Sequence, residues 1–444
     1  MDPLDQLALR EGLSRFGGER VVRARDYFGD PHPIDDLIAL AQRSLPQPLL
    51  VGVSELGKSA HFFLPGLPFL PVIVSARYLG IVGKLLSLRG ESYNLDGLRR
   101  QAAEMLALEL IAEFCLVDGT LDWPAALFFM KSRLVGGNLL IADPRSMGGA
   151  RADILAIPGS GADEHYVCEL MFGLAHELGH AIDQTRGDGA RGPPWCSDDE
   201  LVAYRDFVAG TFGDSDAGLS YRLTGASDVL EPDRLRCEAA ADIEGCRLIA
   251  RAVGPILAKY GNGRATVDVA SLLDAISMNY LALAFIENCR RTANSLNSTT
   301  WTGKRLTELC QQPIAFATRE CILKDHLPII VLEALHPDRD VPADLFGAEG
   351  ERHVRRIDPE LRGMCLTAWD RATQGNKGFY DETEAGILAA IKVSENDDAQ
   401  MQQLVADYSK VAAKSSFAVE NFVCLAAELG VPDSRWKALA DAIM

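Results

Sequence analysis

The sequence predicts an α+β fold in which short strands occur early in the chain and long helices follow. Two observations lead to this expectation. In about the first 160 residues, short apolar runs recur between Pro and Gly residues, as they do in strands. Beyond that point the apolar residues recur at helical spacing over much longer stretches. We therefore expect a mixed part followed by a nearly all-helical part.

The early part of the chain combines helices with short strands. The first 45 residues or so are expected to be helical, because Leu7, Leu9 and Leu13 recur near helical spacing. A long helix is expected at Leu95–Leu116, and short strands are expected on both sides of it. These strands are Leu49–Val53, His61–Leu64, Pro71–Ser75, Ala125–Lys131, Asn138–Ala142 and Asp153–Ile157.

Longer helical patterns begin near residue 163. The helix expected at Asp163–Gln184 starts with acidic side chains, which suit a helix N-terminus. A Gly- and Pro-rich loop, Arg186–Glu200, precedes a helix at Pro232–Val253, where the proline fits the first turn. A further helix is expected at Thr266–Asn294. Most of the remainder is expected to be helical, with breaks at Pro337, Pro342, Gly375 and Pro432.

Length and pattern together suggest three regions. The chain has 444 residues, about three times a typical domain of ~150 residues. We expect a mixed N-terminal region over residues 1–124, a core over 125–260 and an α-helical region over 261–444.

Composition excludes several classes of partner. The chain has 44 Lys and Arg residues against 62 Asp and Glu residues, a net charge of −18. This excess disfavours nucleic acid and anionic membrane surfaces, which attract cationic proteins. The ten cysteines are scattered without a CxxC pair, which favours a reducing compartment. The chain shows neither a signal-peptide pattern nor an uninterrupted apolar run of roughly 20 residues. We therefore expect a cytoplasmic protein without a membrane span.

One motif carries chemistry. His176-Glu177-Leu178-Gly179-His180 is a His-Glu-x-x-His pattern within an apolar, helix-compatible run. Residues four apart share one helix face, so His176 and His180 can present imidazole nitrogens to one metal ion. Glu177 is rotated by about 100° from His176, which suits a base that acts on water beside the metal. The alternative is a chance match on a structural helix without metal.

A catalytic zinc needs a third protein ligand, and Glu238 is the best candidate. It precedes the small residues Ala239–Ala241, which would allow two helices to approach closely. Asp242 lies one turn later on the same face and could accept a hydrogen bond from a ligand histidine. The alternatives are a solvated acidic face, or ligation by Glu244, Asp183 or His336.

The two motifs in this order resemble the gluzincin pattern HExxH…ExxAD. They are similar to the CaaX-prenyl-protease and heat-shock membrane-protease family and its small soluble relatives, over roughly residues 125–255. The resemblance implies a zincin-like catalytic core, in which a small sheet packs on the HExxH and ExxAD helices. It also implies one zinc ion held by His176, His180 and Glu238, with Glu177 as base and Asp242 supporting a ligand. Because no membrane span is expected in this chain, the resemblance does not imply a membrane-embedded or prenylated substrate.

A His-Pro element, His336-Pro337, resembles one found downstream of ExxAD in some of these proteases. The resemblance implies that His336 stabilises the oxyanion or gates the zinc. The alternative is a helix-terminating His-Pro. Four tyrosines are further candidates for an oxyanion donor, and the sequence does not choose between them: Tyr166, Tyr204, Tyr221 and Tyr280.

Together these observations predict a soluble zinc endopeptidase that acts on a protein or peptide. A water molecule held at zinc would attack the peptide carbonyl, with Glu177 as general base. A strand edge at Asn138–Ala142 or Asp153–Ile157 would align an extended substrate. The loop Arg186–Glu200 would be a lid over the cleft or a tolerated surface insertion. Two other functions remain open: a regulatory or partner-binding protein with a structural or degenerate zinc site, and a zinc hydrolase of a non-peptide bond.

Overall fold

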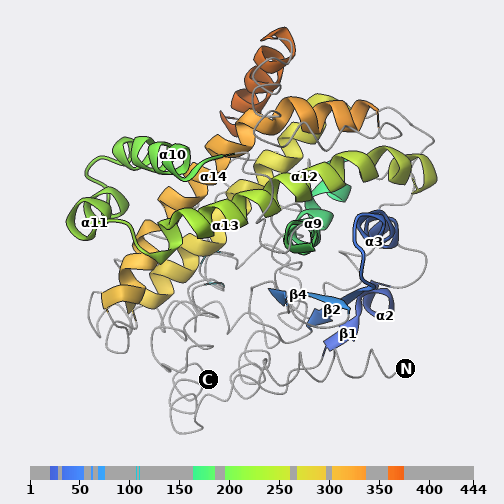
Figure 1. The fold of residues 1–444 in the computed structure, drawn as a ribbon, viewed down its shortest axis with the longest axis horizontal. Coiled ribbons are helices and arrows are strands. Elements are labelled where there is room, and N and C mark those ends of the chain that lie inside the picture. The colour runs from blue at the N-terminus through green and yellow to red at the C-terminus, as the bar shows by residue number, and fades with distance from the viewer. Residues whose placement is uncertain are drawn as a thin grey trace, which may run out of the picture. The chain divides into compact units, whose positions relative to one another are not determined.

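The computed structural model describes eleven parts of the chain (Figure 1): residues 21–28, 33–54, 62–63, 69–75, 107, 110, 164–185, 196–260, 268–296, 303–336 and 359–374. These residues are mostly helical and include one small sheet, so the α+β class is confirmed at that level. The strands expected between residues 125 and 157, and the chain beyond 374, lie outside the described residues. So does most of the expected helix Leu95–Leu116, of which residues 107 and 110 are described as helical.

A four-stranded sheet forms from the N-terminal part of the chain. Its strand order is β1-β2-β4-β3, with a parallel β2–β4 pair between two antiparallel pairs. The three strands expected in this part are present, and the buried valines of β2 and β4 explain why they pair. The strand bounds are β1 Val21–Arg23, β2 Leu49–Ser54, β3 Phe62–Phe63 and β4 Leu70–Ser75.

The expectation of helix throughout the first 45 residues is wrong at residues 21–23, which form β1. Two adjacent β-branched residues, Val21 and Val22, favour an extended backbone there. The antiparallel pairing of Val22 with Val53 gives this short segment its hydrogen-bond partners.

The helices expected at Asp163–Gln184, Pro232–Val253 and Thr266–Asn294 are present in that order, and the helical segments between residues 198 and 230 were not expected. The helix with the HExxH motif is one residue displaced from its expected bounds, whereas the ExxAD helix runs seven residues further, through Pro255. The bounds are α2 Ala24–Phe28, α3 Pro33–Arg43, α9 Glu164–Thr185, α10 Asp198–Thr211, α11 Asp216–Thr224, η2 Asp228–Leu230, α12 Pro232–Tyr260, α13 Val269–Leu296 and α14 Gly303–Leu335. Residues 359–374 form a further helix.

Two glycines set the distance between α9 and α12. A Cβ atom at Gly179 of α9 would overlap the backbone carbonyl of Ala241 on α12. A Cβ atom at Gly245 of α12 would lie 2.9 Å from backbone atoms of Ala175 and His176. The two helices therefore touch backbone to backbone at two levels, a close approach that the small residues Ala239–Ala241 predicted. This contact fixes the register between the HExxH and ExxAD motifs.

The sheet that packs on the HExxH helix comes from an unexpected part of the chain. Strands β3 and β4 contact α9, and α3 contacts both α9 and α12. The sheet and α3 lie within residues 21–75, which were expected to lie outside the catalytic core. Strand pairing and helix packing unite segments that are distant in sequence, and no composition change marks such contacts.

The chain divides into two compact units that differ from the expected linear regions 1–124, 125–260 and 261–444. One unit joins Met1–Leu86, Gly148–Tyr280 and Cys310–Gly375. The other joins Ser87–Met147, Leu281–Leu309 and Asn376–Met444. The first unit contains the observed sheet, α9, α12 and most of α14. The N-terminal and C-terminal regions therefore both contribute to the unit that carries the two motifs.

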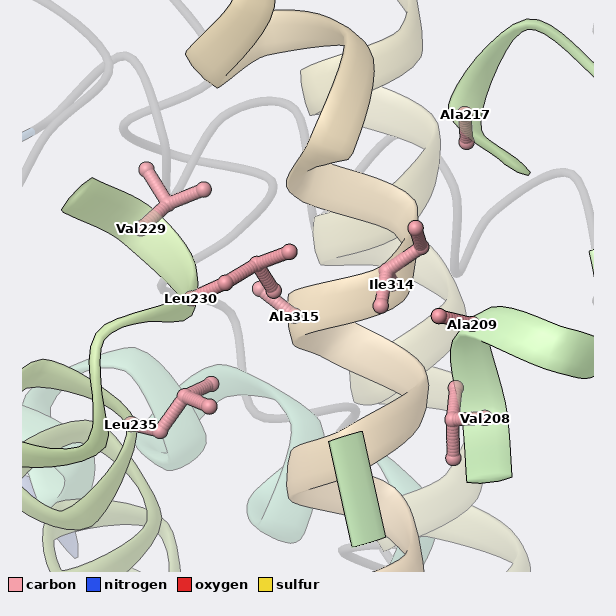
Figure 2. Close-up of a cluster of buried hydrophobic side chains, with 8 residues drawn as sticks. All are labelled: Val208, Ala209, Ala217, Val229, Leu230, Leu235, Ile314 and Ala315. Carbon is pink, nitrogen blue, oxygen red and sulfur yellow. The ribbon is translucent and has the colours of Figure 1, made fainter. Parts of the chain in front are cut away.

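The connection between α9 and α12 packs on α14. Buried apolar side chains from α10, α11, η2 and the first turn of α12 surround α14 at Ile314 and Ala315 (Figure 2). The expected loop Arg186–Glu200 ends earlier than predicted, because Ser197 caps α10 and forms a capping box with Glu200. Residues 186–195 of that loop lie outside the described residues.

Within α13, the stretch Val269–Arg291 is long and apolar enough to cross a membrane, although no membrane span was expected from the sequence. Most of its apolar stretch is buried inside the protein. This is weak evidence for a membrane span, because the core helices of soluble proteins have the same length and composition.

Candidate metal centre

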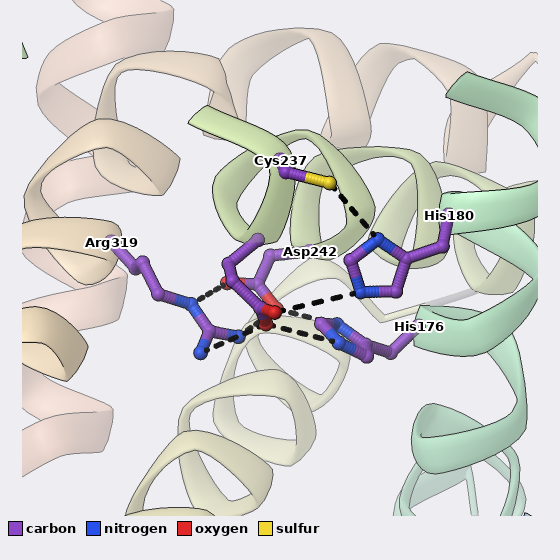
Figure 3. A network of polar contacts seen from close by, with 6 residues as sticks. His176, His180, Cys237, Asp242 and Arg319 are labelled. Carbon is purple, nitrogen blue, oxygen red and sulfur yellow. Dashed lines mark hydrogen bonds and ion pairs between the residues drawn. The ribbon is translucent and has the colours of Figure 1, made fainter. Parts of the chain in front are cut away.

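Helices α9 and α12 bring three potential metal ligands together. His176 Nε2 lies 3.6 Å from one carboxylate oxygen of Glu238, and His180 Nε2 lies 3.9 Å from the other. One donor atom from each residue lies within 4.8 Å of the others. The two imidazole rings meet edge to face with centroids 4.7 Å apart, as expected for residues four apart on a helix. This group could hold a metal ion (Figure 3).

The spacing of the donor atoms suits a small cation. Ligand atoms around a tetrahedral zinc ion are roughly 3.3 Å apart, given bond lengths of about 2.0–2.2 Å. The two observed nitrogen–oxygen distances, 3.6 and 3.9 Å, exceed this value by a few tenths of an ångström, but they run to different oxygens of Glu238. One donor atom from each residue gives a group within 4.8 Å, which would have to contract around a bound ion. The Glu238 side chain is 32% exposed, against 10% and 12% for the two histidines. The donor group therefore faces solvent on the Glu238 side.

Asp242 fixes the orientation of one histidine. Its Oδ1 lies 2.8 Å from Nδ1 of His176, the contact that the sequence analysis expected. When Nδ1 carries the proton and donates it to Asp242, the Nε2 lone pair of His176 is free to bind a cation. Asp242 itself is fully buried one turn beyond Glu238 on α12.

Arg319 of α14 is a member of this cluster that sequence reasoning missed. Its Nε and Nη2 donate hydrogen bonds of 2.7 Å to the two oxygens of Asp242. Its Nη1 lies 3.5 Å from Oε2 of Glu238. In the sequence this arginine is one basic residue in a long helical pattern, 77 positions after Asp242. No motif or spacing distinguished it.

The pKa shifts of the residues in this cluster follow from their burial and these contacts. Burial opposes charge on His176, but its hydrogen bonds to Asp242 and Glu238 raise its pKa to about 10 in the metal-free protein. Burial and the neighbouring charge of His176 lower the pKa of His180 to about 4. Although burial opposes ionisation of Asp242, Arg319 and His176 lower its pKa to about 2. Two histidines four residues apart therefore have opposite preferences for a proton.

Glu177 lies next to the donor group but is not part of it. Its side chain is buried, with 6% of the residue exposed. Burial and, to a smaller extent, the negative charge of Glu238 raise the pKa of its carboxyl to about 8 against the opposing effects of His176 and Arg319. A carboxyl group in such surroundings binds a proton more readily than an ordinary glutamate.

The second histidine has a weaker partner than the first. The Sγ atom of Cys237, on α12, lies 3.7 Å from Nδ1 of His180 (Figure 3). Sulfur is a weak hydrogen-bond acceptor, so this contact orients the ring less strongly than a carboxylate does. Its position leaves Nε2 of His180 directed toward Glu238.

The structure does not bring His336 to this cluster. It is an exposed residue directly after the last residue of α14, 17 positions beyond Arg319. That separation corresponds to about 25 Å of helix. Its backbone N–H donates to the carbonyl of Leu332, so the structure agrees with the helix-terminating alternative. We do not assign a catalytic role to His336.

The other candidates for a zinc ligand or an oxyanion donor have different neighbours. Glu244 accepts a hydrogen bond from Arg247, and the metal-binding group found among the described residues does not include Glu244 or Asp183. Tyr204 donates to Asp325, and Tyr221 donates to Asp206. Tyr280 lies near Asp242 and Arg319, but it is only 5% exposed and so is poorly placed to reach a substrate. The side chain of Tyr166 lies outside the described residues.

The chain matches no protein-family model, no curated protein and no solved structure. The likeness to gluzincins therefore rests on the two motifs. What supports a function is the arrangement of His176, His180, Glu238 and their neighbours.

Proposed function

We propose that this protein is a zinc-dependent endopeptidase, with zinc held by His176, His180 and Glu238. The observation that carries the proposal is the convergence of the HExxH and ExxAD motifs, whose three donor atoms lie within 4.8 Å of one another. We further propose that its substrate is a protein or peptide and that it acts in the cytoplasm.

The charge of the cluster supports a divalent cation. Glu177, Glu238 and Asp242 carry three negative charges when ionised, and Arg319 supplies one positive charge. Asp242, Glu177 and Arg319 are 0%, 6% and 7% exposed. Without a metal, two protons would balance the remaining charge, because the pKa of His176 is raised to about 10 and that of Glu177 to about 8. A doubly charged cation would take the place of these two protons. Two imidazoles and one carboxylate favour zinc over calcium or magnesium, which prefer oxygen ligands.

The donor count supports a catalytic site. Structural zinc sites are closed by four protein ligands, whereas catalytic sites have three and leave one position open. Among the residues that the structure describes, the cluster offers three donors, and Cys237 faces the Nδ1 side of His180 instead of the donor side. This arrangement favours a hydrolase over the alternative of a structural zinc site.

Glu177 is the residue proposed to move the proton. Zinc in such sites polarises the scissile carbonyl and makes water more acidic. The Glu177 carboxylate takes a proton from the attacking water and gives it to the leaving amine nitrogen. Burial favours the protonated carboxyl midway through this cycle. Asp242 meanwhile keeps the proton of His176 on Nδ1, away from the metal-binding nitrogen.

An extended peptide suits the surroundings of α9. Strand β3 contacts α9 and, among the described strands, lies at one edge of the sheet. An edge strand can pair with an extended peptide through main-chain hydrogen bonds. The two segments that were expected to align the substrate, Asn138–Ala142 and Asp153–Ile157, lie outside the described residues.

The test is a search for cleavage products. The purified full-length protein, loaded with zinc, is incubated with a cytosolic extract, and new protein N-termini are identified by mass spectrometry. We expect new N-termini that disappear after treatment with a zinc chelator and return when zinc is restored. A zinc-loaded protein that produces no new N-termini, but hydrolyses small esters or amides, would support the non-peptide alternative.

A further inference from the structure

A single guanidinium joins the two carboxylates of the candidate metal centre. Arg319 binds both oxygens of Asp242 at 2.7 Å and approaches Oε2 of Glu238 at 3.5 Å. Oδ1 of Asp242 also receives the contact from Nδ1 of His176. A continuous chain of contacts therefore runs from α14 through Asp242 to a proposed ligand on α9 (Figure 3).

We propose that Arg319 is a positioning residue for the metal centre and that α14 is therefore a part of it. This inference rests on the proposed zinc site. With both oxygens of Asp242 held, the carboxylate cannot rotate away from His176. The same guanidinium limits the movement of Glu238, whose two oxygens face the two histidines. Arg319 thus directs two of the three proposed ligands, His176 and Glu238, toward one point.

The shape of the guanidinium is essential to this role. Arginine presents a planar fork of donors that matches the two oxygens of a carboxylate, whereas lysine is a compact charge on a flexible stem. A lysine at position 319 would keep the positive charge but could not hold both oxygens of Asp242 and also approach Glu238. The substitution Arg319→Lys therefore separates positioning from charge compensation.

The chain contains a matched control for this substitution. Arg247 of α12 is also 7% exposed, and it also binds both oxygens of a buried carboxylate, Glu333 of α14. It also donates a hydrogen bond to Glu244, which is not a member of the donor group. Arg247→Lys therefore disturbs the same pair of helices in the same chemical way, without touching the proposed ligands.

The experiment compares zinc affinity and cobalt spectra in the full chain. We expect Arg319→Lys to bind zinc about 10–100-fold more weakly than the wild type. This is the usual loss when a residue that orients a metal ligand is replaced. The visible spectrum of its Co²⁺ form should also change. Arg247→Lys should keep the wild-type zinc affinity and cobalt spectrum, although its melting temperature should fall. Wild-type affinity and spectrum in Arg319→Lys would overturn the inference.

A second variant keeps the inference testable if Arg319→Lys does not fold. Asp242→Asn removes the charge through which Arg319 is proposed to act, and it should weaken zinc binding by a similar factor. If both variants fold, their combined effect should be smaller than the product of the two, because they break one chain of contacts. Wild-type zinc binding by Asp242→Asn would refute the inference. Failure of the wild type to bind zinc would instead refute the proposed function itself.

Discussion

Replacing Glu177 with glutamine is expected to lower peptide hydrolysis by at least about 10²–10⁴-fold, the usual contribution of a general acid–base group. Glutamine has nearly the same shape and stays polar, but its amide cannot accept the proton of the attacking water. The loss should appear in kcat, because the change affects proton transfer and leaves the substrate contacts in place. The measurement is the rate of cleavage of a substrate found among the new N-termini.

The zinc content of the Glu177→Gln variant decides the interpretation. Glu177 lies outside the donor group of His176, His180 and Glu238, so the variant should bind zinc as tightly as the wild type. Glu238→Gln is the contrasting variant, because a neutral amide is a poor zinc ligand and should weaken zinc binding itself. If Glu177→Gln lost zinc while Glu238→Gln kept it, the proposed roles of the two glutamates would be reversed.

Adding a methyl group at Gly179 is expected to destabilise the fold and to weaken metal binding together. The new Cβ atom would overlap the carbonyl of Ala241, and a backbone atom cannot move aside without shifting α12. Such overpacking costs about 1–3 kcal/mol, whereas alanine gains about 1 kcal/mol over glycine in a helix. The cost of the overlap should therefore exceed the gain in helix propensity, and the free energy of unfolding should fall. Because Glu238 and Asp242 flank Ala241 on α12, the shift would also separate the proposed ligands.

Gly210→Ala is the matched control for Gly179→Ala. Gly210 also lies within a helix, α10, but a Cβ atom there would meet no other atom within 4 Å. This control should leave zinc affinity unchanged and raise the free energy of unfolding slightly. Denaturant unfolding and zinc titration of both variants provide the measurements. Gly179→Ala with wild-type stability and wild-type zinc affinity would show that the close helix contact is not required.

The site could be predicted from the sequence wherever local spacing determines geometry. His176 and His180 share a helix face because they are four apart, and Glu238 and Asp242 share a face for the same reason. The small residues Ala239–Ala241 predicted that two helices approach closely, and the structure has that contact between Ala241 and Gly179. Helix geometry therefore accounts for the pairwise arrangement within each motif.

Residues that reach the site through tertiary packing could not be predicted in this way. Arg319 lies on a helix that the sequence predicted, yet nothing in its neighbourhood distinguished it from other basic residues. The strands that contact α9 were expected, but their contact with this helix was not, because packing between distant segments leaves no mark on composition. By contrast, the start of α10 had a recognisable signal, the Ser-x-x-Glu pattern of Ser197 and Glu200.

Metal analysis of the purified full-length protein tests the zinc centre most directly. The wild type should contain one zinc ion per chain, and His176→Ala and His180→Ala should each lose most of it while keeping the helical circular dichroism of the wild type. Each substitution removes one donor of a three-residue group and leaves α9 free of any new clash. Stoichiometric zinc in His176→Ala, or a wild type that binds no zinc when it is supplied, would contradict the proposed metal centre.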